Sequence, residues 1–91
     1  MADEIEIEWS PVNCGTQQIG IWVARLIRPV RSVPFAKVVQ RLDGGWSLWH
    51  CPKGMGVDDP YSIHRYGLDR FKPMAHEGRW ARAHWRAIPA A

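Results

Sequence analysis

The chain has 91 residues, 46% of them hydrophobic and six of them tryptophan, and its net charge is +3. This length predicts a single small domain over residues 1–91, and the aromatic content excludes a disordered chain. The longest uncharged apolar run, residues 19–24, is too short to span a bilayer, so we expect no membrane partner.

Charge is distributed unevenly along the chain. Residues 1–10 hold four acids and no Lys or Arg, whereas residues 11–91 hold all twelve Lys and Arg against five acids. Such a basic body favours an acidic macromolecule as partner, either a nucleic acid or an acidic protein surface. The acidic start is unlike a signal peptide, so we expect a cytoplasmic protein whose Cys14 and Cys51 are reduced thiols.

The first half of the chain predicts strands. Residues 4–9 alternate Glu with Ile and Trp, a pattern typical of a half-buried strand at a sheet edge. Residues 10–18 read as a loop. Residues 19–28 are apolar on both faces, which predicts a central strand covered on both sides.

Residues 35–51 predict a hairpin with a two-residue turn at Asp43-Gly44, a common hairpin sequence. That register places on one face Ala36, Val38, Leu42, Trp49 and Cys51. The other face then holds Lys37, Val39, Arg41, Trp46, Leu48 and His50, with Arg41 over the ring of Trp46. A turn at Gly44-Gly45 is the alternative, and it would flip the faces of one strand relative to the other.

The second half predicts a short helix over residues 61–66, capped by Asp59 and started by Pro60, and then a short strand over residues 68–72. Residues 77–88 predict a helix with tryptophans on one side and arginines on the other, and a strand is the alternative. The predicted fold is α+β: an antiparallel meander of four or five strands with a C-terminal helix. A small all-β barrel is the alternative.

Three arginines on the last predicted helix, Arg79, Arg82 and Arg86, form the strongest candidate binding site. At this spacing their guanidiniums can meet successive phosphates or an acidic protein face. An ordinary solvated helix face is the alternative. Trp46 is the candidate for stacking on a base. The alternative is that Trp46 is a partly buried residue of the sheet. The candidate binding residues are therefore Arg79, Arg82, Arg86, Arg41, Trp46, Lys37, Arg70 and Lys72.

The histidines and cysteines do not have the spacing of a metal site, because the chain has no CxxC, HxxxH or HExxH motif. A Cys–His nucleophile pair would need a third, orienting group, and none is visible in the sequence. We therefore predict a protein without a metal, without a cofactor and without enzymatic activity.

Three short motifs resemble those of a known group. The sequence Trp9-Ser-Pro near the start, the central Gly45-Trp46 and the closing His84-Trp85-Arg86-Ala87-Ile88-Pro89 resemble the DUF551-like short phage and prophage proteins of unknown function. In that group the closing motif is strand-like, in contrast to the helix expected for residues 77–88. The resemblance implies a mobile-element origin and no known catalytic residues.

Together these features predict a phage-type binding protein that acts by stoichiometric contact. Its basic surface would engage a host protein or nucleoprotein complex, in the manner of an anti-CRISPR inhibitor or an adaptor. Direct binding to a DNA or RNA backbone is the alternative.

Overall fold

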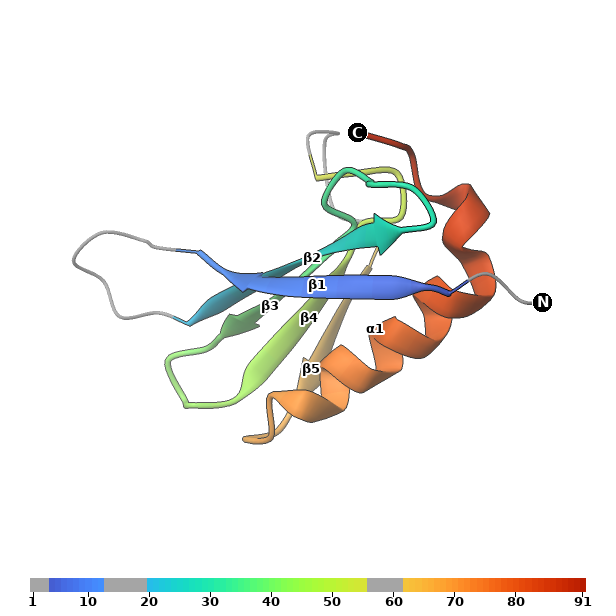
Figure 1. Cartoon of the computed structure of the whole chain (residues 1–91). Helices are drawn as coiled ribbons and strands as arrows, with labels where there is room; N and C mark the ends of the chain where they lie inside the picture. Colours follow the sequence, from blue (N-terminus) through green and yellow to red (C-terminus); the bar gives the residue numbers. More distant parts are fainter. Residues whose placement is uncertain (1–3, 13–19, 56–61) are drawn as a thin grey trace.

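The computed structural model describes residues 4–12, 20–55 and 62–91. Five strands form one antiparallel sheet in the order β1-β2-β3-β4-β5, followed by one helix (Figure 1). The elements are β1 (Glu6–Pro11), β2 (Ile21–Arg28), β3 (Ala36–Gln40), β4 (Trp46–His50), β5 (Ser62–Tyr66), α1 (Phe71–His84) and the 3₁₀ turn η1 (Trp85–Ala87). The predicted meander with a C-terminal helix is confirmed, and the sheet is not closed into a barrel.

The core lies between α1 and one face of the sheet. The strands contribute Ala24, Leu26, Ala36, Val38, Trp46 and Leu48, and the C-terminal segment contributes Ala81 and Ile88. Phe35, which precedes β3, is completely buried among them. On the other face of β2, Ile21, Val23 and Ile27 are only half-buried, so the expectation of a strand buried on both sides is wrong.

The hairpin turn is longer by one residue than predicted. Residues 42–44 form its loop: the amide of Arg41 donates to the carbonyl of Gly45 at 2.7 Å, and the amide of Gly44 donates to the carbonyl of Arg41 at 3.0 Å. Gln40 therefore pairs with Trp46 and Val38 with Leu48. This register turns Trp46, Leu48 and His50 toward the α1 side and Trp49 away from it, the reverse of the predicted faces for β4.

Gly44 makes this loop possible because its φ is +88°, a conformation that costs a residue with a Cβ roughly 1–2 kcal/mol. We expect Gly44→Ala to lower the free energy of unfolding by about 1 kcal/mol or more in urea titrations. Gly67→Ala is the matched control, because no heavy atom lies within 4 Å of a Cβ added there and its φ is not positive. Equal losses in the two variants would contradict this account of the turn.

The predictions for residues 61–72 are wrong in type. Residues 62–66 form β5 and pair with β4, from Trp46↔Tyr66 to His50↔Ser62, instead of forming a helix. Residues 71 and 72 begin α1 instead of ending a strand. Pro73 occupies the first turn of this helix, where its missing amide is not needed. The carboxylate of Asp69 accepts a hydrogen bond from the amide of Phe71 at 2.9 Å, which supports the helix start.

The chain beyond α1 is extended and returns to the segment after β2. Ala90 forms a bridge with Ser32, and the carbonyl of Pro89 accepts from the amide of Val33 at 3.1 Å. The predicted helix at 77–88 is thus confirmed up to His84 and ends in η1. Among the described residues, no helix is long and apolar enough to cross a membrane. The expectations for Cys14, Asp59, Pro60 and most of the loop 10–18 lie outside the described residues.

Candidate binding surface

The solvent side of α1 carries basic side chains and no acidic ones. Lys72, Arg79 and Arg82 are exposed and fall within about 80° of arc at 100° per residue. Glu77, the only acid in α1, is 1% exposed and faces the sheet. None of the three cations makes an ion pair within the described part of the chain. Arg86 follows in η1, with its guanidinium 4.5 Å from the ring of Trp85. We name Lys72, Arg79, Arg82 and Arg86 the basic helix surface.

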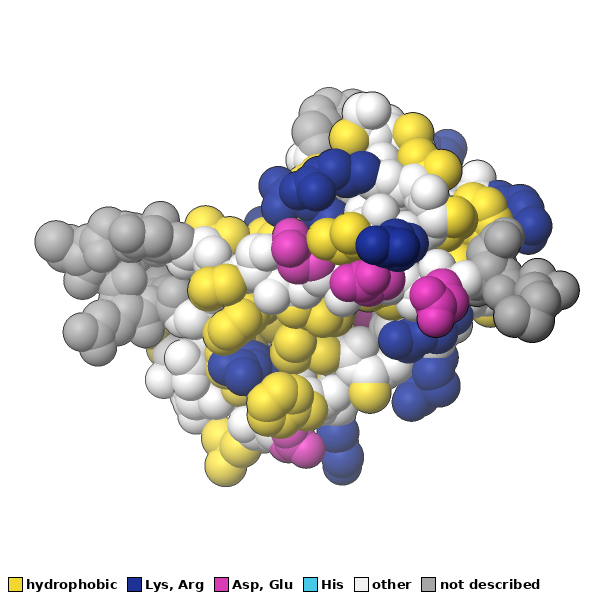
Figure 2. All heavy atoms as spheres, in the orientation of Figure 1, with side chains coloured by type: hydrophobic (Ala, Val, Ile, Leu, Met, Phe, Trp, Pro, Cys, Tyr) yellow, Lys and Arg dark blue, Asp and Glu magenta, His cyan; other side chains and the backbone are white. Residues whose placement is uncertain are grey.

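A groove of about 290 Å³ runs beside this surface, between β1 and α1. We name it the β1–α1 groove; its residues are Ile7 and Trp9 from β1 and Phe71, Met74, Ala75, Gly78 and Arg82 from α1. Figure 2 shows hydrophobic side chains gathered below β1, beside the start of α1, with Lys and Arg side chains along the helix. Phe71 is 63% exposed, so a large aromatic ring stands open to solvent here. Basic and apolar surfaces are therefore contiguous on α1.

Arg70 stands at the start of the helix among aromatic rings. Its guanidinium lies 4.4 Å from the ring of Trp22, 4.7 Å from that of Phe71 and 5.9 Å from that of Trp46. Each cation–π contact of this kind contributes roughly 0.5–2 kcal/mol. Its Nε atom is buried and has no hydrogen-bond partner among the described residues. Arg70 is thus a cation held by aromatic rings and not by a carboxylate.

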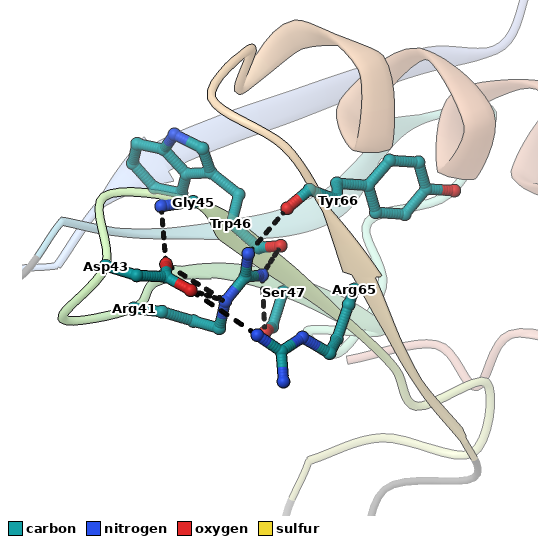
Figure 3. Close-up of polar contacts among 7 residues, drawn as sticks. All are labelled: Arg41, Asp43, Gly45, Trp46, Ser47, Arg65 and Tyr66. Carbon is teal, nitrogen blue, oxygen red and sulfur yellow. Dashed lines mark hydrogen bonds and ion pairs between the residues drawn. The ribbon is translucent and has the colours of Figure 1, made fainter.

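Arg41 and Trp46 occupy structural positions. Trp46 is 7% exposed in the core, so the expectation of a ring available for stacking is wrong. Arg41 does not lie over that ring: its guanidinium donates to the backbone carbonyls of Trp46 and, at 2.8 Å, Tyr66 (Figure 3). A Cβ on Gly45 would lie 2.0 Å from an Arg41 Nη atom, so the second glycine of the turn makes room for this side chain. The longer loop is the physical reason for both corrections.

Lys37 lies on the sheet face opposite α1, with its Nζ 4.2 Å from the ring of Trp49. Of the eight candidate binding residues, the structure brings five to the C-terminal segment and leaves Lys37 on the far face of the sheet. Arg41 and Trp46 lie in the hairpin. The five are Arg70, Lys72, Arg79, Arg82 and Arg86.

A buried carboxylate lies on the other flank of α1. Glu77 accepts a hydrogen bond from Nδ1 of His50 at 2.5 Å, and the edge of His50 meets the ring of Trp80, with centroids 4.4 Å apart. Burial raises the pKa of Glu77, and the hydrogen bond from His50 opposes that rise. His64 and His76 line the same cavity of about 160 Å³. Among the described residues, no group of three or more His, Cys, Asp or Glu side chains is placed to hold a metal ion.

Sequence reasoning did not find the groove or the Glu77–His50 pair. His50 and Glu77 are 27 positions apart, and no local pattern links a strand end to a helix interior. The sequence predicts a strand at Phe71, and this prediction does not place its ring beside β1 on the flank of a helix. One signal was present in the sequence: Glu77 is the only acidic residue after Asp69, so it stands alone among the basic residues of the C-terminal segment.

Comparisons of the chain with protein-family models, curated proteins and solved structures find no match. The resemblance to short phage proteins therefore stays a prediction. The geometry of the surface carries the functional argument alone.

Proposed function

We propose that this chain is a non-catalytic binding protein that acts by stoichiometric contact with the acidic surface of another protein. The observation that carries the proposal is the contact between the basic helix surface and an open apolar groove. Protein interfaces are enriched in Arg, Met and aromatic residues, and a few such residues supply most of the binding energy. Arg82, Phe71, Met74 and Trp9 form such a set.

Direct binding to a nucleic acid is the second candidate. It is favoured by the three cations of α1 that have no ion pair among the described residues, because phosphate contacts need only positive charge. Base stacking finds less support, since the proposed ring of Trp46 is buried. A phosphate contact also gives no role to the apolar groove. The protein surface is therefore the better candidate.

The proposed setting is the cytoplasm of a host cell, which the resemblance of the short motifs to phage proteins would imply. The partner there would be a host protein or nucleoprotein complex, with the chain acting as an inhibitor or an adaptor. The proposal requires no cofactor and no catalytic step.

The test is a pull-down from lysate of the source organism, with and without nuclease, using purified chain and two charge variants. The variant Arg79→Glu/Arg82→Glu reverses the basic helix surface, and Arg65→Glu is the control on β5, where the side chain is 73% exposed. We expect a partner that survives nuclease treatment, is lost at least tenfold in the double variant and is retained by the control. Capture that disappears with nuclease, and weakens steeply with salt, would favour the nucleic-acid candidate instead.

A further inference from the structure

The helix layer of this fold covers the sheet only in part. α1 packs on β3 and β4, whereas on the same face the side chains of β1 and Trp22 of β2 are incompletely covered. Ile7, Trp9 and Trp22 remain half-buried, although they touch the core. The open strip lies beside α1, along the β1–α1 groove (Figure 2). A second helix placed next to α1 would cover this strip, as helices do in two-layer folds.

The flank of α1 that borders the groove has room for such a neighbour. Its middle positions are the exposed Ala75 and the buried Gly78, and a Cβ at Gly78 would lie 3.9 Å from Ile7 and 3.0 Å from the Arg82 guanidinium. Small side chains there allow a second helix to approach at about 8–10 Å between axes. Phe71 and Met74 provide the apolar contacts at one end of the groove.

Charges select the kind of helix. Arg82 lines the groove, and Arg70, which precedes α1, lies against the ring of the groove residue Phe71. The two arginines are about 18 Å apart along the helix axis at 1.5 Å per residue, which is the length of about three helical turns. The glutamates of β1 do not offset them: Glu6 and Glu8 alternate with the groove residues Ile7 and Trp9. Glu6 is also ion-paired with Arg28 at 3.4 Å. The rim along α1 therefore attracts a negatively charged helix flank.

We propose that the β1–α1 groove binds an amphipathic helix of the partner, with an apolar stripe against Trp9, Phe71 and Met74 and an acidic flank against Arg70 and Arg82. This inference rests on the proposed function, whose partner class it specifies. A second copy of this chain does not have the required chemistry, because its own helix is basic on the outside and would be repelled by α1. Pairing of two copies through β1 would bring glutamate rows together.

The test uses three synthetic 14-residue peptides: an amphipathic helix with Leu at i, i+3, i+4 and i+7 and Glu on one flank, the same helix with Lys in place of Glu, and a scrambled sequence. Binding is measured by calorimetry and by the backbone amide shifts of the folded chain. We expect the Glu peptide to bind and the other two to bind at least tenfold more weakly. Shifts should be confined to β1 and the groove flank of α1. Absence of binding by the Glu peptide would overturn the proposal, as would equal binding of all three.

The matched variants are Ala75→Trp, which fills the groove, and Ala83→Trp. Ala83 is also exposed, lies about 80° around α1 from Ala75 at 100° per residue, and is not a residue of the groove. We expect at least a tenfold loss of peptide and partner binding for the first and no change for the second. Phe71→Ala, which removes an exposed ring, should also weaken binding. A partner that is released by Arg79→Glu/Arg82→Glu but retained by Ala75→Trp would refute the groove while sparing the proposed function. A dimer disrupted by Ala75→Trp in sedimentation would assign the groove to a second copy instead.

Discussion

Replacing Arg41 with Met will lower the free energy of unfolding by about 2–4 kcal/mol, although the residue lies beside a surface turn. The Arg41 side chain is 22% exposed, and its guanidinium donates to the backbone carbonyls of Trp46 and Tyr66, on two different strands. A hydrogen bond from a charged donor contributes roughly 1.5–3 kcal/mol. Methionine keeps much of the side-chain volume but has no donor, so the connection between the turn and β5 is lost.

Urea titration of Arg41→Met measures this loss, and Arg65→Met is its control. The Arg41 Nε atom lies 3.2 Å from the Asp43 carboxylate. The Arg65 side chain is 73% exposed, and its guanidinium lies 3.4 Å from the same carboxylate (Figure 3). An exposed ion pair of this kind contributes at most about 1 kcal/mol. Equal destabilisation by the two variants would show that charge near Asp43 matters and that the carbonyl contacts do not.

The variant Glu77→Ala, which removes the buried carboxylate, will lower the free energy of unfolding by about 2–4 kcal/mol at neutral pH. The change leaves a cavity under α1 and removes the hydrogen-bond partner of Nδ1 of His50. Thermal or urea unfolding measures the effect, and Glu4→Ala, at an exposed position, is the control. A loss below about 1 kcal/mol would contradict the structural role given to this pair.

The same residue makes stability depend on pH, and Glu77→Gln isolates that dependence. Below the ordinary carboxyl pKa of 4.5, the folded and unfolded chains both hold the Glu77 proton. Between 4.5 and the raised pKa of the folded state, only the folded chain holds it, so stability falls as pH rises through this window and then levels off. We expect unfolding measurements between about pH 4 and 8 to show this fall in the wild type relative to Glu77→Gln. The histidines that face Glu77, namely His50, His64 and His76, favour its ionised form, so their interaction with the carboxylate is part of the difference between the two chains. If the free energy of unfolding of the wild type, relative to Glu77→Gln, instead rose with pH, the predicted direction would be wrong.

The first four strands were predictable because the signals for them are local. Alternation in β1, the apolar run of β2 and the glycine-rich turn each depend on neighbouring residues. The helix near residue 80 was found through the segregation of its Trp and Arg side chains. Its true start at Phe71 was hidden by Pro73, since sequence alone does not tell a first-turn proline from a helix breaker.

The candidate site was only half predictable, for a different reason. Arg79 and Arg82 lie outside the apolar stripe of the helix, so the sequence pattern alone predicts that they are exposed. Whether the Trp46 ring is buried or exposed depends on the length of the turn, because a shift of one residue exchanges the two faces of a strand. The groove is a tertiary feature: Trp9 and Phe71 are 62 positions apart, and only the folded sheet brings them together.

The meander order has a consequence for the synthesis of this protein. Every strand pairs with its neighbour in sequence, so each hairpin can close soon after it leaves the ribosome, without waiting for distant segments. α1 is made after the five strands, and the apolar face formed by Leu26, Val38 and Leu48 stays open until residues 71–91 follow. A nascent chain that ends before residue 71 therefore presents a bare hydrophobic sheet, the kind of surface that chaperones hold and that drives aggregation.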